Sequence, residues 1–407
     1  MDMQTKVSDP PTEKKTRRAE KIGQRNEVAE YYGFTLVRTP FITKDILSEA
    51  RNLSAVKAKN DGSYALTLCP EEKIAVLRLW SEEELKNMSL PLLIYYNGPI
   101  ERADVKKRSV SEKHIGLEIV GTSKSIAEAI LIKAAIEILR ESGYEDMHVC
   151  LNSIGDKDSV LRFARELSAY YRKHLEHLHT PCRQAFKRDV FDLLECTNEK
   201  CSLIKENAPK SISFLSELSR QHFKEVLEYI EMLDIPYRIH NHLVGDKSFC
   251  CQTLFEIKTG LSDEKTETLA IGVRYDTLPK RLGFRREMPS AGVRLAFKEK
   301  TPRLKNKSAK GKKPKIFFVQ LGFEAKLRSL GIMEELRRSS IPIYQSLSRD
   351  KLASQLALAE SLQIPYTIIM GQKEALEGSI IVRDMISRSQ ETIPINSLPL
   401  YLKRIDL

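Results

Sequence analysis

Long apolar runs and disulfide-type cysteine patterns are both missing from this sequence. No stretch approaches the ~18 consecutive apolar residues that a membrane-spanning helix needs, and the charged first residues lack the apolar segment of a secretory signal. The seven cysteines are an odd number without the spacing of a disulfide framework, which is typical of proteins kept in a reducing compartment. We therefore expect a cytoplasmic protein with no membrane segment.

Several catalytic and metal-binding patterns are missing as well. The sequence has no G-x(4)-G-K-[ST] loop to cradle phosphates and supports no serine or cysteine triad. His179, Cys182, Cys196 and Cys201 are of the residue types that bind zinc. However, 13 and then 4 residues separate the cysteines, so they form no CxxC knuckle. We interpret them as ordinary buried thiols and predict no metal site.

The sequence does carry an excess of positive charge. Its 66 Lys and Arg residues exceed its 55 Asp and Glu residues by 11 over 407 residues, which favours an acidic partner, nucleic acid above all. Residues 298–315 contain nine Lys or Arg against one Glu, with two prolines and a glycine, a composition typical of a linker. Candidates within it for contacts with phosphate groups are Lys307, Lys310, Lys312 and Lys313.

The hydrophobic pattern predicts mixed structure in the first 300 residues. In the segment HIGLEIVG, residues 114–121, alternation predicts a strand whose odd-numbered apolar residues share one face. Ser125 and Glu128 have the spacing of a capping box at the start of a helix over 126–141. Other strands are expected at 34–39, 64–68, 92–96, 147–152 and 249–258, and mostly helical structure from about 174 to 237.

Beyond residue 315 the pattern changes to regular alternation of strands and helices, which is typical of a small α/β domain. The expected strands are 316–321, 341–344, 366–370 and 379–383, and the expected helices are 324–339, 349–362 and one near 398–405.

Nine segments, in order along the chain, carry a resemblance to a known family. They are YYGF…RTP at 31–40, LCPEEKIAVLR at 68–78, HIGLEIVG at 114–121, LNSIGD at 151–156, FDLLEC…C…APKSISFL at 191–215, LVGDKSFCCQTLFE at 243–256, GVRYDTL at 272–278, and KLASQLALAE and IIMGQKEALEGSIIVRDM near the C-terminus. Together they resemble the histidyl-tRNA synthetase family of class II aminoacyl-tRNA synthetases. The resemblance covers nearly the whole chain and rests on collinear agreement, because no single match is decisive.

The resemblance implies an α+β fold, in which a class II synthetase-like antiparallel sheet core carries a helical insertion. A C-terminal α/β domain of the anticodon-binding type follows. The implied divisions are a basic extension at 1–30, the core at 31–297 with its insertion at about 157–240, a basic linker at 298–315, and the C-terminal domain at 316–407. The family also implies a homodimer.

The resemblance further implies an amino-acid pocket formed by Glu71, His114, Glu118, Arg274 and Tyr275. Glu71 and Glu118 stand where the family's carboxylates receive the ammonium and imidazole groups of histidine. A histidine-like small molecule is therefore one expected ligand. The alternative interpretation is that Glu118 and Arg274 form an ion pair that only stabilises the sheet.

The chain departs from the family where the family's chemistry takes place. Arginines that neutralise the reacting carboxylate and phosphate align with Ile100, Gly245 and Glu299, and a threonine near the histidine amino group aligns with Lys73. Amino-acid activation brings two anions together, and losing one fixed donor to a developing anion typically costs ~10²–10³ in rate. The departures therefore predict a pseudoenzyme.

Three functional hypotheses follow. In the first, the protein is an inactive relative, without a cofactor, that binds tRNA or another RNA, or a protein partner. In the second, Arg102, Arg108 or Arg294 supplies the missing positive charge, and the protein is an active histidine–tRNA ligase that uses ATP and Mg²⁺. In the third, it is a regulatory subunit of ATP phosphoribosyltransferase that senses histidine, although that family generally lacks a C-terminal domain such as 316–407.

Overall fold

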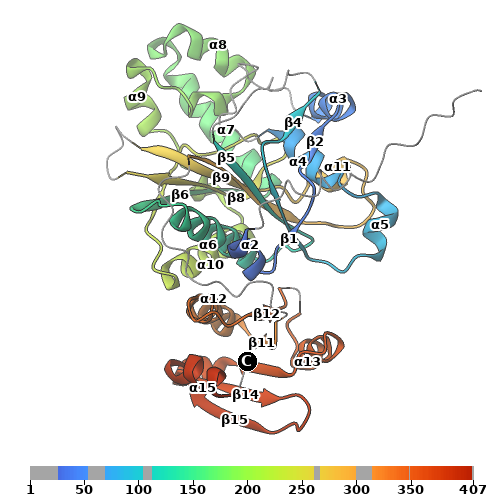
Figure 1. Cartoon of the computed structure of the whole chain (residues 1–407). Helices are drawn as coiled ribbons and strands as arrows, with labels where there is room; N and C mark the ends of the chain where they lie inside the picture. The colour runs from blue at the N-terminus through green and yellow to red at the C-terminus, as the bar shows by residue number, and fades with distance from the viewer. Residues whose placement is uncertain are drawn as a thin grey trace, which may run out of the picture.

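The computed structural model describes residues 26–53, 69–103, 112–260, 266–298, 314–347 and 349–405. They form a larger domain built on one long sheet and a smaller C-terminal domain, drawn below it in Figure 1. Among these residues, no helix is long and apolar enough to cross a membrane. Several sequence predictions lie outside the described residues: most of the basic extension, the strand at 64–68, Arg108, nearly all of the basic linker, and with it Glu299, Lys307, Lys310, Lys312 and Lys313.

The larger domain is organised around an eight-stranded sheet. Its strands are β1 (Thr35–Leu36), β3 (Leu92–Asn97), β5 (Lys113–Val120), β6 (Met147–Gly155), β7 (Tyr237–Ile239), β8 (Cys251–Thr259), β9 (Glu267–Arg274) and β10 (Ser290–Phe297). In space their order is β1-β3-β5-β10-β9-β8-β6-β7. Neighbours are antiparallel except for the outer pairs β1–β3 and β6–β7, so the antiparallel core is confirmed. Strands β2 (Phe41–Ile42) and β4 (Glu101–Arg102) form a separate parallel pair.

Both faces of this sheet are covered, as the burial of side chains on both faces of β5 shows. As the alternation predicts, Ile115, Leu117 and Ile119 share one face and belong to the apolar core that includes helix α6 (Ile126–Glu141). The opposite face of β5 is buried too, although it carries His114 and Glu118. Polar side chains are therefore enclosed on one side of the central sheet, and this enclosure forms the candidate site.

In Figure 1, helices α2 (Glu27–Tyr31), α6 and α10 (Glu217–Met232) lie below the sheet. Helices α7 (Lys157–Lys173), α8 (Thr180–Arg188) and α9 (Glu199–Glu206) lie above it. The remaining elements of this domain are α3 (Lys44–Leu53), α4 (Pro70–Leu77), α5 (Glu82–Asn87), α11 (Leu278–Arg281) and the 3-10 turns η1 (Leu175–His177), η2 (Val190–Leu193) and η3 (Ser211–Phe214).

The bounds predicted for α6 are confirmed, but its capping box is wrong. Ser125 makes no capping bond with its side chain, and its hydroxyl donates instead to Glu225 Oε2 at 2.5 Å. The Glu128 carboxylate is held by Arg274 and His222. Both residues of the expected capping box, Ser125 and Glu128, therefore bond to side chains from distant parts of the sequence.

The C-terminal domain has a five-stranded sheet in the order β12-β11-β13-β14-β15. Its elements are β11 (Ile316–Gln320), α12 (Phe323–Arg338), β12 (Ile343–Gln345), α13 (Leu352–Ser361), β13 (Tyr366–Met370), α14 (Gln372–Glu377), β14 (Ser379–Asp384), β15 (Gln390–Pro394), η5 (Ile395–Ser397) and α15 (Leu398–Arg404). The strand and helix alternation agrees with the sequence pattern, except that α14 and β15 were not expected.

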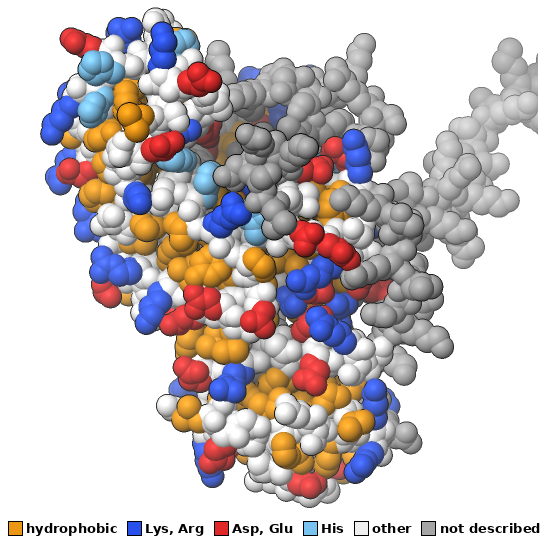
Figure 2. Space-filling model, turned by 90° about the vertical axis from the view of Figure 1, so that its left-hand side faces the viewer, with side chains coloured by type: hydrophobic (Ala, Val, Ile, Leu, Met, Phe, Trp, Pro, Cys, Tyr) orange, Lys and Arg blue, Asp and Glu red, His pale blue; other side chains and the backbone are white. Residues whose placement is uncertain are grey.

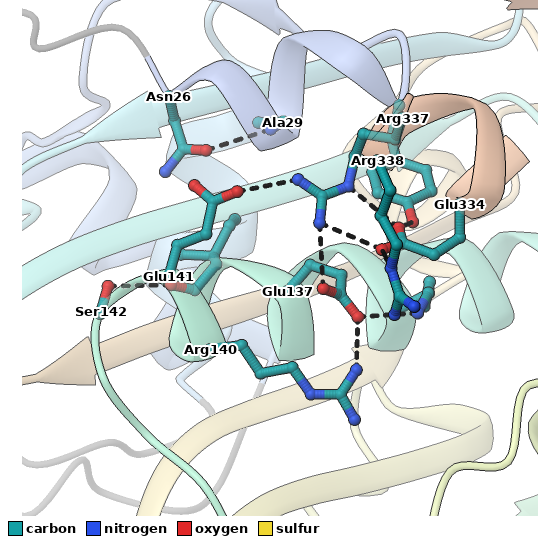
Figure 3. A network of polar contacts seen from close by, with 12 residues as sticks. Asn26, Ala29, Glu137, Arg140, Glu141, Ser142, Glu334, Arg337 and Arg338 are labelled. Atoms are coloured by element: carbon teal, nitrogen blue, oxygen red, sulfur yellow. Dashed lines mark hydrogen bonds and ion pairs between the residues drawn. The ribbon is translucent and has the colours of Figure 1, made fainter. Parts of the chain in front are cut away.

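Charged residues join the C-terminal domain to the larger one at a surface that we call the junction, between α6 and α12 (Figure 3). The Arg337 guanidinium on α12 bonds Glu137 at 3.1 Å and Glu141 at 2.8 Å on α6. It also bonds Glu334 one turn away at 3.0 Å, and Tyr32 donates its hydroxyl hydrogen to Glu334 at 2.9 Å. Helices from distant parts of the sequence therefore share one network of ion pairs.

Candidate functional site

The candidate site is a cluster of buried polar side chains centred on Glu118, on β5, the third strand of the sheet; we call this cluster the cleft. The carboxylate has no exposed surface, and the ammonium of Lys73 on α4 lies 2.7 Å from its Oε1 atom. Tyr275, directly after β9, donates its hydroxyl hydrogen to the other oxygen at 2.8 Å. The Lys73 ammonium also lies 5.2 Å from the centroid of the Tyr275 ring, so these three groups form one buried unit.

Glycines on the neighbouring strands make room for this unit. Gly292 on β10 lies opposite Glu118, and a Cβ added there would be 1.6 Å from the Glu118 carboxylate. Gly116, two residues before Glu118, lies opposite Tyr96 on β3, and a Cβ added there would be 2.3 Å from the Tyr96 hydroxyl. The glycines are therefore needed so that polar side chains can cross the sheet face.

Burial and partners act in opposite directions on the Glu118 carboxyl. Burial raises its pKa above the ordinary value, while the Lys73 ammonium and the Tyr275 hydroxyl lower it, and the net direction is upward. A buried carboxylate is costly without a close cation. Lys73 is therefore the cation that offsets part of the cost of burying the Glu118 carboxylate.

The first turn of α4 supplies two more charges to the same cleft. Glu71 accepts a 2.8 Å ion pair from Arg102 on β4, and Glu72 is paired with Arg294 on β10. The three consecutive residues of α4 thus contact three different strands, and each carboxylate in the cleft has a cation from the chain itself.

His114 lies on the same face of β5 as Glu118 and is buried. Burial and the nearby Arg294 guanidinium lower its pKa to about 4. The imidazole is therefore neutral at pH 7 and adds no positive charge to the cleft.

Arg274 lies on the other side of the sheet, which corrects the proposed ion pair with Glu118. The register places Arg274 opposite Ala291 and Glu118 opposite Gly292, and side chains of adjacent residues on β10 point to opposite faces. The guanidinium instead binds both oxygens of Glu128 on α6. It also donates to the carbonyl oxygens of Thr122 and Lys124 at 3.0 and 3.1 Å and pairs with Asp276 at 3.1 Å.

The predicted pocket is therefore brought together only in part. Glu71, His114, Glu118 and Tyr275 lie on the cleft side, and Arg274 is a buried anchor between the sheet and α6. Of the positions expected to have lost arginines, Ile100 is buried and apolar, and Gly245 lies in the loop between β7 and β8 with a φ of 60°.

Three residues outside the predicted pocket complete the cleft: Lys73, Glu72 and Arg294. The sequence marks Lys73 as a departure from the family's threonine and Arg294, a lone arginine within an apolar strand, as an alternative source of positive charge. Glu72 carried no signal of its own, because only the fold shows that it faces Arg294.

Comparisons with known proteins agree with this fold. Residues 315–405 match the family model of the anticodon binding domain. A histidine–tRNA ligase of Dehalococcoides mccartyi is 28% identical over 348 residues, covering 84% of this chain and 83% of the relative. The histidine–tRNA ligase of Fervidobacterium nodosum is 29% identical over 382 residues, covering 89% of each.

A solved structure shares the architecture over its full length. The apo histidyl-tRNA synthetase of S. aureus superimposes with a TM-score of 0.51 at 24% identity, covering 98% of this chain and 99% of that one. This likeness supports the fold, and the sequence matches extend over both domains. Over most of its length the chain is therefore similar to histidine–tRNA ligases, and its C-terminal domain matches the anticodon binding domain.

Proposed function

We propose that this protein binds tRNA through its C-terminal domain and does not activate histidine. The match of residues 315–405 to the anticodon binding domain supports the first half. The observation that carries the second half is the buried pair of Lys73 and Glu118. We further propose that the chain acts in the cytoplasm as a homodimer. Light scattering of the purified protein tests the dimer.

The pair matters because of what the family's carboxylate does. Where a family member would offer a free carboxylate to the substrate's cationic group, Glu118 already holds the Lys73 ammonium at 2.7 Å. A substrate ammonium would have to displace Lys73 and leave it buried and unpaired, and breaking a buried ion pair typically costs about 3–5 kcal/mol. Such a penalty corresponds to a loss of more than about 100-fold in affinity.

The other cleft charges support the same conclusion. Activation requires free donors that can hold a carboxylate and a phosphate together. Arg102 and Arg294 are already bound to Glu71 and Glu72, and Ile100 has no donor. The cleft therefore has about as much negative as positive charge, which does not favour the approach of two anions.

Two measurements test the proposal separately. Histidine-dependent pyrophosphate exchange is expected to stay at background, and calorimetry is expected to show no heat of histidine binding. Binding of tRNA is expected at low salt and to weaken as salt rises. Exchange activity would refute the first half, and an absence of tRNA binding at low salt would refute the second.

A matched pair of variants sharpens the first measurement. Lys73→Thr restores the residue type that the family has at this position and leaves Glu118 without its internal cation, so histidine binding is expected to appear. Lys73→Arg keeps a cation in place and is expected to bind no histidine. Histidine binding to the native protein as tight as to Lys73→Thr would show that Lys73 does not fill the site.

One observation favours a second candidate, an active histidine–tRNA ligase that uses ATP and Mg²⁺. Arg102 and Arg294 reach the cleft from positions other than those of the family's arginines. In this case they would exchange their carboxylate partners for substrate groups. Exchange activity that is lost in Arg294→Met would establish this candidate. The matched C-terminal domain counts against a regulatory subunit of ATP phosphoribosyltransferase.

A further inference from the structure

Three cysteines from separate elements of the helical insertion meet at one point. Cys182 lies in α8, Cys196 follows η2, and Cys201 lies in α9. Their sulfur atoms all lie within 4.8 Å of one another, and those of Cys182 and Cys196 are 3.0 Å apart. We propose that this three-cysteine cluster binds a zinc ion that fixes the fold of the insertion.

The spacing of the sulfur atoms fits zinc. Zinc–thiolate bonds of about 2.3 Å in a tetrahedron place neighbouring sulfurs about 3.8 Å apart. Sulfur atoms that all lie within 4.8 Å of one another are close enough for small side-chain adjustments to reach this value. The 3.0 Å separation is too long for a disulfide, whose sulfurs are about 2.05 Å apart, and all three cysteines are free thiols.

Backbone N–H groups directed at the sulfur atoms are a second, independent observation. The amide of His179 donates to Cys201 Sγ at 3.4 Å, and the amide of Asn198 donates to Cys196 Sγ at 3.4 Å. Such donors stabilise thiolate over thiol, and thiolate is the form that binds metal. Ordinary buried thiols do not require this arrangement.

The surrounding structure shows what a metal would contribute. Helices α8 and α9 have 9 and 8 residues, and η2 has 4. Helices this short are marginal unless tertiary contacts hold them. The three sulfurs tie together α8, α9 and the segment between them, so one ion would connect all the short elements of this part of the insertion.

Tetrahedral zinc needs a fourth ligand. His179 is the nearest candidate in the sequence, because its own amide already contacts Cys201. Histidine side chains are visible at the upper end of the molecule in Figure 2, the end at which α8 lies in Figure 1. The His179 imidazole is not among the ligand atoms that lie within 4.8 Å of one another, so it would have to turn toward the sulfurs to take the fourth position, and a water molecule is the other outcome of the test.

The experiment measures metal in the full-length protein, purified without chelators. We expect about one zinc per chain by elemental analysis, and after exchange with cobalt a near-ultraviolet thiolate-to-cobalt absorption band. These readouts need no variant and do not depend on the catalytic state of the cleft. A protein without zinc that also gives no cobalt–thiolate band, or one that contains a Cys182–Cys196 disulfide by thiol counting and mass spectrometry, would overturn the site.

Variants then locate the ion. Cys201→Ser is expected to lose at least tenfold in zinc affinity, and Cys69→Ser, which changes a cysteine outside the cluster, is expected to retain it. His179→Ala is expected to change the cobalt spectrum if the imidazole is the fourth ligand, and to leave it unchanged if water is. Equal zinc content in Cys201→Ser and Cys69→Ser would exclude the cluster as the binding site.

Discussion

Buried charges occur both in the cleft and at the junction, but they are paired differently. In the cleft each carboxylate has one close cation from another element, as Glu118 has Lys73. At the junction one carboxylate is shared by several cations. Those around Glu137 are Lys133, Arg140 and Arg337.

The difference shows what each arrangement tolerates. Loss of one cation from a one-to-one pair leaves a buried charge without compensation, which is strongly destabilising. Loss of one cation from a shared network leaves the carboxylate with others. Each carboxylate of the cleft therefore depends on a single cation. The shared network at the junction can lose one cation and still connect the two domains.

The largest expected effect is in the cleft. Lys73→Met leaves Glu118 with only the Tyr275 hydroxyl, and we expect the free energy of unfolding at pH 7 to fall by about 3–5 kcal/mol. Urea denaturation measures it. The double variant Lys73→Met/Glu118→Gln should recover most of the loss, because it removes the charge as well as its partner. If the single and double variants are equally stable, the pair is not the unit that we describe.

The second prediction compares Glu118 with Glu128, which lies on the other face of the sheet. Both carboxylates are fully buried. Burial also opposes ionisation at Glu128, but Arg274 and His222 lower its pKa from 4.5 to about 2. The stability that Glu128 contributes is therefore present above pH 4.5 and is lost as the pH falls toward 2, by about 2 kcal/mol between pH 5 and pH 3.

Glu118 should show the opposite slope. Its folded pKa is raised, so its contribution is present below pH 4.5 and is lost as the pH rises through the folded value. Stability profiles of Glu118→Gln and Glu128→Gln, each subtracted from that of the native protein, measure the two slopes. Parallel profiles would show that one cation from Lys73 compensates burial as well as the two partners of Glu128.

The third prediction concerns the junction. Arg337→Ala removes bonds to Glu137, Glu141 and Glu334, but Glu137 and Glu334 keep other partners. We therefore expect a loss of about 1–2 kcal/mol in the free energy of unfolding, smaller than that of Lys73→Met. Denaturation followed by fluorescence and circular dichroism measures it. A loss as large as that of Lys73→Met would mean that the network does not share its charges.

The parts of the fold that were predictable have strong local patterns. The alternation of β5 and the apolar length of α6 gave the correct elements, and the C-terminal alternation gave most of that domain. Strand β15 was missed because its sequence, QETIP, is mostly exposed and has no apolar face. Helix α14 was missed because it is only six residues long.

The candidate site was less predictable because it depends on register and on distant partners. The resemblance to the family pointed to Glu118 and Tyr275, but only the pairing of β9 with β10 shows that Arg274 faces α6. The convergence of the three cysteines, which we interpreted from the sequence as ordinary buried thiols, was hard to predict for the same reason. Spacing along the chain does not reveal that α8 returns Cys182 to Cys196.

The smallest expected effect is at Arg338, the neighbour of Arg337. Its side chain is 65% exposed and pairs only with Glu334 among the ion pairs of the described residues. Exposed pairs contribute about 0–1 kcal/mol because water and salt screen them, and Glu334 keeps Arg337 and Tyr32. We expect Arg338→Ala to change the free energy of unfolding by less than about 0.5 kcal/mol, measured beside Arg337→Ala in the same buffer. Equal losses in the two variants would show that total charge on α12, rather than burial of the individual guanidinium, holds the junction together.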